Sequence, residues 1–310
     1  MGKILLGTCS WTEETLIKGG KFYPSYAKDA EARLRYYASQ FPIVEVDSSY
    51  YSMPNEKAAR LWVERTPDDF VFDVKAFRLF TQHQTPPASL PRDIRDALPA
   101  SLMEKTNLYQ NNMPPELLNE IWHRFESALL PLDTVGKLGV VLFQFPPWFT
   151  MGSDKLDYIL SCTERLKQYR LAVEFRNHSW MSDANRKNTI SFLKENNLPY
   201  VCVDEPQGFK SSMPPVIEPT SEIAIIRFHG RNQENWEKKG IKASDRFSHY
   251  YTEEELREWI PRIDGLAAKA TRVHVLFNTH QDDQAIVNAK KLAGLMDIQL
   301  GKQDTLGEDF

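Results

Sequence analysis

Short runs of β-branched and aromatic residues recur along the chain, separated by segments in which apolar residues follow a helical period. The strand-like runs are residues 4–8, 43–47, 70–75, 138–145, 171–176, 200–204, 223–229 and 273–278. Alternation of this kind is typical of parallel β/α architecture, and a closed barrel needs about eight strands. The pattern therefore predicts a TIM-type (β/α)8 barrel of the α/β class, formed by residues 1–300 as one domain.

Helical periodicity fills most of the connections between these runs. Asp29 and Asn55 stand where helix N-caps are expected, and a Thr-Glu-Glu-Glu capping box begins at Thr252. The predicted helices cover residues 29–40, 55–62, 115–129, 153–166, 184–196, 252–270 and 282–296.

Two connections depart from the regular repeat. Residues 205–219 contain prolines and a glycine that forbid a regular helix, so we expect an irregular loop that closes over one end of the barrel in place of the helix after the sixth strand. Residues 76–137 form a connection far longer than usual, and we expect it to carry extra helices or a lid. We expect residues 301–310 to be a frayed tail.

Composition and charge limit the classes of partner. With 310 residues, 42% hydrophobic and 26% charged, the chain is long and apolar enough to bury a large core. Its formal net charge of −4 supplies no basic field, so binding of nucleic acid is not favoured and no membrane surface is expected as a partner. Any binding of anions must therefore be local.

The N-terminal residues show no apolar stretch of signal-peptide length, and no run approaches the roughly 20 residues of a membrane-spanning helix. A cytoplasmic protein is the expectation. Cys9, Cys162 and Cys202 lie far apart without a C-x-x-C pair, which argues against a structural zinc site or a disulfide framework and fits reduced thiols.

The alternation within the predicted strands places charged residues inside the barrel. In residues 172–176, Glu174 and Arg176 share one face, while Val173 and Phe175 share the face that helices would cover. By the same parity the other inward-facing polar residues are Glu45, Asp47, Asp73, Lys75, Gln144, Arg227, His229, His274 and Asn278.

This polar interior has two interpretations. A barrel is normally filled by branched apolar side chains, and an unpaired buried polar group costs several kcal/mol. Because several of these residues end their strands, where barrel enzymes build active sites, a functional site is the first interpretation. The second is an internal ion-pair network of Glu45, Lys75, Glu174, Arg176 and Arg227 that catalyses nothing. We expect His274 and Asp73 to be structural.

The charged residues suggest a particular chemistry. Arg176, Arg227 and Lys75 suit a carboxylate or phosphate, which predicts a small anionic substrate. Glu174 is the predicted base, and Glu45 is its predicted partner in proton transfer. The amides of Gln144 and Asn278 would orient the substrate. The first hypothesis is therefore a hydrolase or isomerase that works by glutamate acid–base catalysis.

Two alternatives remain open. Asp204, His229 and Glu174 form a candidate ligand set for a divalent metal, which would suit a metal-assisted phosphodiesterase or nuclease with Trp11 or Trp180 as a stacking platform. The other alternative is a non-catalytic ligand-binding scaffold, in which residues 76–137 contact an unknown partner protein. No glycine-rich dinucleotide or P-loop motif is visible, so we expect no such cofactor.

Aromatic residues follow several predicted strand ends. Tyr50, Tyr51, Trp148 and Trp180 take such positions, and Trp11 follows the first strand. At the rim of a barrel these rings can stack on a sugar or a base. Packing of loops over the barrel is the alternative interpretation for each of them.

The motifs at these positions resemble those of the YecE-like proteins, the domain of unknown function family seventy-two. They are Gly-Thr-Cys-Ser-Trp from Gly7, Phe-Tyr-Pro from Phe22, Tyr-Tyr-Ala from Tyr36, Val-Glu-Val-Asp-Ser-Ser-Tyr-Tyr from Val44, Phe-Gln-Phe-Pro-Pro from Phe143, Val-Glu-Phe-Arg from Val173, Ser179-Trp180, Arg-Phe-His-Gly from Arg227 and Phe277-Asn278. The resemblance spans nearly the whole chain. It implies a TIM-barrel-like fold and no settled activity.

The family motifs map onto Ser10, Trp11, Glu45, Asp47, Lys75, Gln144, Glu174, Arg176, Arg227 and Asn278. Ser10, Trp11 and Asp47 thereby join the candidate substrate-binding residues. The sequence departs from the family pattern at Cys9, where a serine is common, and at Thr279-His280 after Asn278. The roles of Cys9 and His280 are therefore left open.

Overall fold

Eight parallel strands form one sheet that curves into a barrel in the computed structural model, which describes residues 1–301. The strands are β1 (Lys3–Thr8), β2 (Ile43–Val46), β3 (Val71–Lys75), β4 (Leu138–Gln144), β5 (Leu171–Glu174), β6 (Val201–Asp204), β7 (Ile223–Phe228) and β8 (Arg272–Phe277). Their order in the sheet is β5-β4-β3-β2-β1-β8-β7-β6, and a parallel bridge between Val173 and Tyr200 links its two edges. The predicted TIM-type barrel is confirmed.

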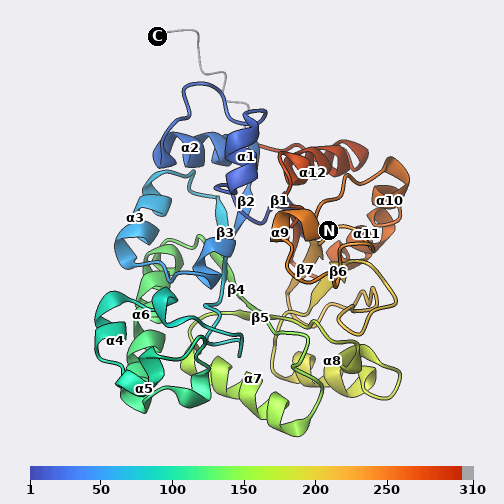
Figure 1. Ribbon diagram of the computed structural model, residues 1–310. Coiled ribbons are helices and arrows are strands. Elements are labelled where there is room, and N and C mark those ends of the chain that lie inside the picture. The colour runs from blue at the N-terminus through green and yellow to red at the C-terminus, as the bar shows by residue number, and fades with distance from the viewer. Residues whose placement is uncertain (302–310) are drawn as a thin grey trace.

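The helices lie around the strands as an outer layer (Figure 1). They are α1 (Glu14–Gly19), α2 (Ala30–Gln40), α3 (Glu56–Glu64), α4 (Arg92–Asp96), α5 (Ala100–Met103), α6 (Pro115–Thr134), α7 (Ser153–Arg165), α8 (Arg186–Glu195), α9 (Ala243–Arg246), α10 (Glu253–Arg257), α11 (Ile260–Ala267) and α12 (Gln284–Leu295). No helix within residues 1–301 is long and apolar enough to cross a membrane.

The predicted helix starts are confirmed by their caps. The Asp29 carboxylate accepts a hydrogen bond from the Ala32 amide at 2.8 Å, and Asn55 Oδ1 accepts one from the Ala58 amide at 2.9 Å. The capping box at Thr252 is also present. The prediction of one helix over residues 252–270 is wrong: α10 ends at Arg257 and α11 begins at Ile260, directly before Pro261, which lacks the amide proton that a continuous helix would need.

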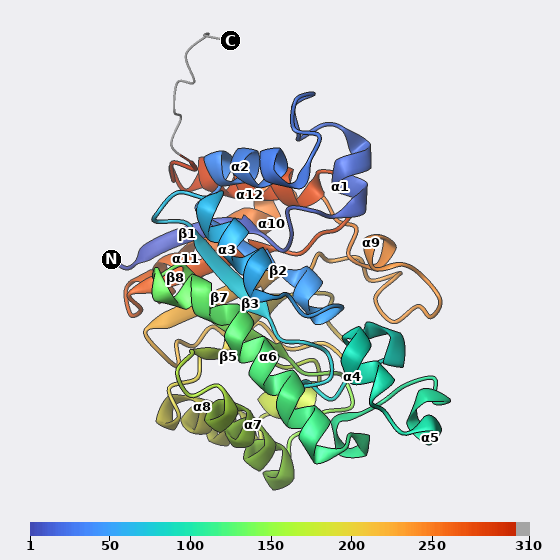
Figure 2. The same cartoon turned by 90° about the vertical axis from the view of Figure 1, so that its left-hand side faces the viewer.

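Both irregular connections are confirmed. Residues 76–137 contain α4, α5 and the long helix α6, which lies beside α3 (Figure 2). Residues 205–222 contain neither helix nor strand. The tail predicted for residues 301–310 falls almost entirely on residues 302–310, outside the described part of the chain.

A small apolar cluster lies inside the barrel below the charged residues of the mouth. It consists of Leu5, Cys9, Ile43, Val71 and Leu276. The Asp73 carboxylate contacts His274 Nδ1 at 2.9 Å and accepts a hydrogen bond from the Val140 amide at 3.1 Å, so Asp73 pairs with a neighbouring base as expected, while His274 Nε2 has no hydrogen-bond partner among the described residues.

Gly139 on β4 makes room for the Asp73 carboxylate. A Cβ atom at this position would lie 2.2 Å from Asp73 Oδ1. This distance is much shorter than a van der Waals contact, so the barrel can hold this buried carboxylate only opposite a glycine.

Candidate functional site

Glu174, the last residue of β5, lies at the centre of a buried polar cluster at the opposite, C-terminal end of the barrel. Its carboxylate binds Arg227 Nη1, accepts a hydrogen bond from Gln144 Nε2 at 2.6 Å and lies 3.0 Å from His229 Nε2. Burial opposes its ionisation, but Arg227, His229 and Arg176 together outweigh burial and hold the pKa of Glu174 well below its ordinary value. Glu174 is therefore a carboxylate at neutral pH.

Arg227 joins Glu174 to Glu45 across the barrel interior. Its Nη2 donates to Glu45 Oε1 at 2.7 Å and lies 3.6 Å from Cys9 Sγ. Burial raises the pKa of Glu45, although Arg227 and Lys75 oppose the shift. Neither the Arg227 side chain nor the Glu45 side chain is exposed. Arg227 therefore binds these two glutamates and does not face the mouth, where a substrate anion would enter.

His229 is held in one orientation by a chain of hydrogen bonds. Burial lowers its pKa to about 3, so the ring is neutral. Because Glu174 can only accept, His229 Nε2 carries the proton, and Nδ1 accepts from the Asn278 amide at 2.9 Å. Asn278 Oδ1 in turn accepts from His280 Nε2 at 3.0 Å, and His280 Nδ1 lies 3.5 Å from Glu13.

Arg176 connects Glu174 to a second carboxyl group, Glu205, that the strand pattern of the sequence does not predict. Arg176 Nη1 lies 3.4 Å from Glu174 Oε1 and 2.9 Å from Glu205 Oε2. Burial raises the pKa of Glu205 to about 7, although Arg176 and the hydrogen bond from the Met213 amide oppose the shift. Glu205 directly follows the end of β6, and that position was the signal that would have found it.

Lys75 and Asp47 form a further ion pair at the mouth, with 2.7 Å between Nζ and Oδ1. Burial opposes this charge separation, yet each partner favours the charged form of the other: the pKa of Asp47 is lowered and the pKa of Lys75 is raised. The Lys75 and Asp47 side chains are 9% and 13% exposed, and Arg176 is 12% exposed. A substrate can therefore approach each of these three groups.

The predicted metal-ligand set is not assembled. His229 contacts Glu174, and both of its ring nitrogens are in use. Asp204 instead accepts two hydrogen bonds from Arg231 Nε, at 2.9 and 3.1 Å. Within residues 1–301, no three His, Cys, Asp or Glu side chains converge as metal ligands.

Two tryptophans predicted to stack on a substrate belong to the core. Trp11 is 6% exposed and packs edge-on against Trp62 and Phe72. Trp180 is fully buried and stacks on Phe175, with 4.0 Å between the ring centroids. Their rings fill the space between strands and helices, which a sequence pattern does not distinguish from the rim.

Ser10 and Trp148 do lie towards the mouth, at loops that follow β1 and β4. Ser10 has a positive φ of 127°, and its hydroxyl accepts a hydrogen bond from the Thr12 amide at 3.0 Å. Trp148 is 54% exposed. Neither side chain contacts Glu174.

Loops cover the side of the mouth formed by β5 to β8. The Trp236 ring lies against Arg176, with 4.7 Å from the guanidinium carbon to the ring centroid, and Trp236 Nε1 donates to Ser211 Oγ at 3.1 Å. Phe247 contacts the rings of His229 and His280. The two connections on either side of β7 therefore meet over the buried carboxylate, as predicted for residues 205–219.

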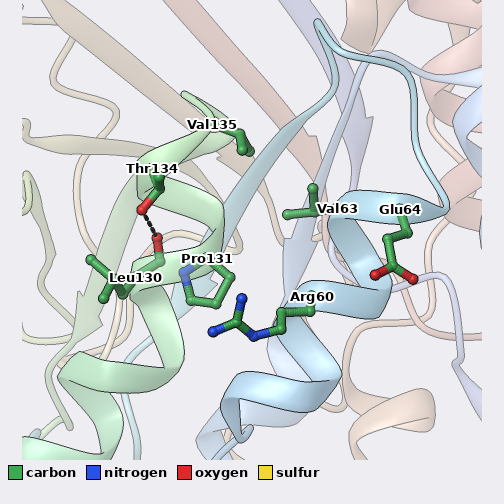
Figure 3. A pocket seen from close by; sticks show the side chains of 7 residues that line it. All are labelled: Arg60, Val63, Glu64, Leu130, Pro131, Thr134 and Val135. Carbon is green, nitrogen blue, oxygen red and sulfur yellow. Dashed lines mark hydrogen bonds between the residues drawn. The ribbon is translucent and has the colours of Figure 1, made fainter.

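A separate surface hollow of ≈ 270 Å³ lies between α3 and α6 (Figure 3). Its lining residues are Arg60, Val63, Glu64, Leu130, Pro131, Thr134 and Val135. The hollow lies where these helices end and the chain turns into β3 and β4, so it is at the barrel end away from Glu174. It contains none of the predicted site residues.

Comparison with known proteins supports the resemblance drawn from the motifs. Residues 5–308 match the model of the family described as "Protein of unknown function DUF72". The UPF0759 protein YunF of Bacillus subtilis (strain 168) is 32% identical over 300 residues, which cover 96% of this chain and 95% of that protein.

Two solved structures share the fold over nearly their full length. A DUF72 family protein from Thermotoga maritima MSB8 has a TM-score of 0.74 and 27% identity, over 95% of this chain and 99% of that one. A DUF72 family protein from Enterococcus faecalis V583 has a TM-score of 0.76 and 24% identity, over 96% of each chain. The chain therefore belongs to the DUF72 family, the YecE-like proteins of unknown function.

Proposed function

We propose that the protein is a barrel enzyme that transfers protons to and from a small anionic substrate at the C-terminal mouth, with Glu174 as the base and Glu205 as the acid. The main support for this proposal is that two carboxyl groups contact the same nitrogen atom of Arg176. Arg176 Nη1 lies 3.4 Å from Glu174 and 2.9 Å from Glu205, and the environments of the two groups shift their pKa values in opposite directions.

Two neighbouring carboxyl groups with separated pKa values are the usual basis of acid–base catalysis near neutral pH. Glu174 stays ionised and can accept a proton. Glu205, with a pKa of about 7, is about half protonated at neutral pH, and its protonated form can donate a proton. The sequence predicts Glu45 in this second role. Glu205 fits the role better because it shares Arg176, which reaches the mouth, with Glu174, whereas Glu45 is joined to Glu174 only through the fully buried Arg227.

The cations at the mouth support binding of an anion. When Glu205 is protonated, Arg176 loses one of its two carboxylate partners, and its guanidinium can pair with a carboxylate or phosphate of the substrate. Lys75 adds a second charge at the mouth, and the amides of Gln144 and Asn278 donate to Glu174 and His229 and so position these two groups. Both hydrolysis and isomerisation use such an arrangement.

The test is a reaction screen in D₂O with hydroxycarboxylates and sugar phosphates, followed by ¹H and ³¹P NMR. We expect the wild-type protein to produce new signals or to exchange a substrate C–H, and Glu174→Gln and Glu205→Gln each to slow the reaction about 100-fold or more. Asp73→Asn is the matched control, because it changes a buried carboxylate at the other end of the barrel. Unchanged rates in both glutamine variants would refute the proposal, and a ligand that binds without reacting would indicate a non-catalytic scaffold.

A further inference from the structure

The side of the mouth formed by β2 to β4 carries a group of aromatic rings that the proposed chemistry does not use. Tyr50 and Tyr51 follow β2, His83 follows β3 and Trp148 follows β4. We call these four residues the aromatic ledge. Consecutive ring centroids along it lie 4.9, 5.2 and 5.8 Å apart, and Tyr51 and Trp148 are 51% and 54% exposed.

The exposed tryptophan of the ledge is held in place. Trp148 Nε1 donates a hydrogen bond to the Gln82 carbonyl at 3.3 Å. Gln82 has a φ of 60°, a left-handed conformation that non-glycine residues rarely adopt. Such strained backbone conformations are found mainly at functional sites. The Thr81 hydroxyl binds His83 Nδ1 at 2.8 Å and orients the next ring. A large apolar ring that is fixed while half exposed is suited to contact another molecule.

The ledge borders the charged groups that remain accessible. Lys75 Nζ lies 4.7 Å from the centroid of the Tyr50 ring and binds Asp47 at 2.7 Å. Burial lowers the pKa of His83 to about 3, helped by the charges of Lys75, Arg78 and Arg176. His83 is therefore a neutral ring within electrostatic reach of the cations at the mouth.

We propose that the aromatic ledge binds the sugar ring of the substrate, so that the substrate is a carbohydrate with one anionic group directed at Lys75 and Arg176. This inference rests on the proposed function, since it names the substrate class of the same mouth. A sugar ring presents an apolar C–H face, which Trp148 and Tyr51 can cover. Its hydroxyls both donate and accept hydrogen bonds, which suits the mixed carboxylate and ammonium of Asp47 and Lys75.

A polynucleotide fits these observations less well, although its bases also stack on aromatic rings. Binding of a nucleic acid needs cations free to neutralise successive phosphates. Lys75 and Arg176 suit one anionic group at this mouth, and the net charge of −4 supplies no wider basic surface for successive phosphates.

The test compares ring and acyclic ligands that carry the same charged group. Isothermal titration calorimetry would measure glucose 6-phosphate and glucuronate against glycerol 3-phosphate and lactate. We expect Trp148→Ala and Tyr51→Ala each to weaken binding of the ring compounds about tenfold and to leave the acyclic compounds within about twofold. Tyr26→Ala is the matched control, because Tyr26 is 64% exposed outside the ledge and should change neither class.

Three results would overturn the inference. The first is an equal loss of affinity for ring and acyclic compounds in the Trp148→Ala and Tyr51→Ala variants, and the second is no binding of either ring compound to the wild-type protein at 10 mM. The third is tighter binding of uridine and adenosine monophosphate through Trp148 than of the sugar phosphate. A different result would refute the proposed function alone: Glu174→Gln would leave the reaction rate intact, while Trp148→Ala would still weaken binding of the ring compounds.

Discussion

The two ends of the barrel interior both bury charged side chains, but they do so in different ways. Towards the N-terminal end, His274 Nδ1 contacts both carboxylate oxygens of Asp73, at 2.9 and 3.1 Å. At the C-terminal end, four carboxyl groups (Glu45, Asp47, Glu174 and Glu205) share three cations (Lys75, Arg176 and Arg227).

Buried charge alone therefore does not distinguish the two ends. The pair at the N-terminal end holds one carboxylate against one histidine, whose Nε2 has no hydrogen-bond partner among the described residues. At the C-terminal end the carboxyl groups outnumber the cations, so they cannot all be ionised and compensated. The pKa of Glu174 is lowered, whereas the pKa of Glu205 is raised. Unequal compensation is what separates pKa values and permits proton transfer.

We expect the largest effect on stability from removal of Arg227, the cation that joins Glu174 and Glu45. Arg227→Met leaves Glu174 and Glu45 buried without their shared partner, and we expect it to lower the free energy of unfolding by about 3–5 kcal/mol. Urea denaturation would measure this loss. A loss below about 1 kcal/mol would mean that Arg227 is not the main counter-ion of the cluster.

A pH-dependent effect of about 3 kcal/mol is expected from Glu205, given 1.4 kcal/mol for each unit of pKa shift. Its pKa is raised from 4.5 to about 7 in the folded protein, so between these values the folded state binds more protons than the unfolded state. The stability contributed by this group is therefore fully present below pH 4.5 and is lost as the pH rises to about 7.

The wild-type protein and Glu205→Gln should be unfolded in urea at several pH values. The stability of the wild type relative to the variant should fall as the pH rises through this range. The difference isolates Glu205 from His229, whose lowered pKa has the opposite effect: it destabilises the fold as the pH falls from 6.5 towards 3. A difference that does not change with pH would contradict the assignment.

The smallest of these effects is expected at the lower end of the barrel. Asp73→Asn keeps an oxygen that can accept from the Val140 amide, so we expect a loss of about 1–3 kcal/mol of stability and no change in ligand binding at the mouth. Thermal unfolding and calorimetry would measure both quantities. A large loss of ligand binding would mean that the two ends are coupled.

Much of the fold could be predicted from the sequence because strand and helix periodicities are local properties. The alternation in residues 171–176 and 223–229 correctly placed Glu174 and Arg227 inside the barrel, where they meet. The face of Asp204 was harder to infer, because its partner Arg231 comes from the irregular segment after β7. Trp11 and Trp180 show the same limit: a ring that follows a strand can turn towards the mouth or under a helix.

Glu205 escaped prediction for a related reason. It lies in a proline-rich loop, outside any periodic pattern, and its position depends on the Met213 amide and on Arg176. Such contacts join segments that only the folded chain brings together. Strand ends and the residue after each of them therefore deserve equal weight when barrel sites are sought.

The most direct test of the account is an NMR titration of the side-chain carboxyl carbons in ¹³C-labelled protein, with Glu174→Gln and Glu205→Gln to assign the two signals. We expect Glu205 to titrate near pH 7, while Glu174 stays ionised well below the ordinary range of a glutamate. If both carboxyl groups titrate together near their ordinary value of 4.5, the two are not separated and the acid–base assignment is wrong.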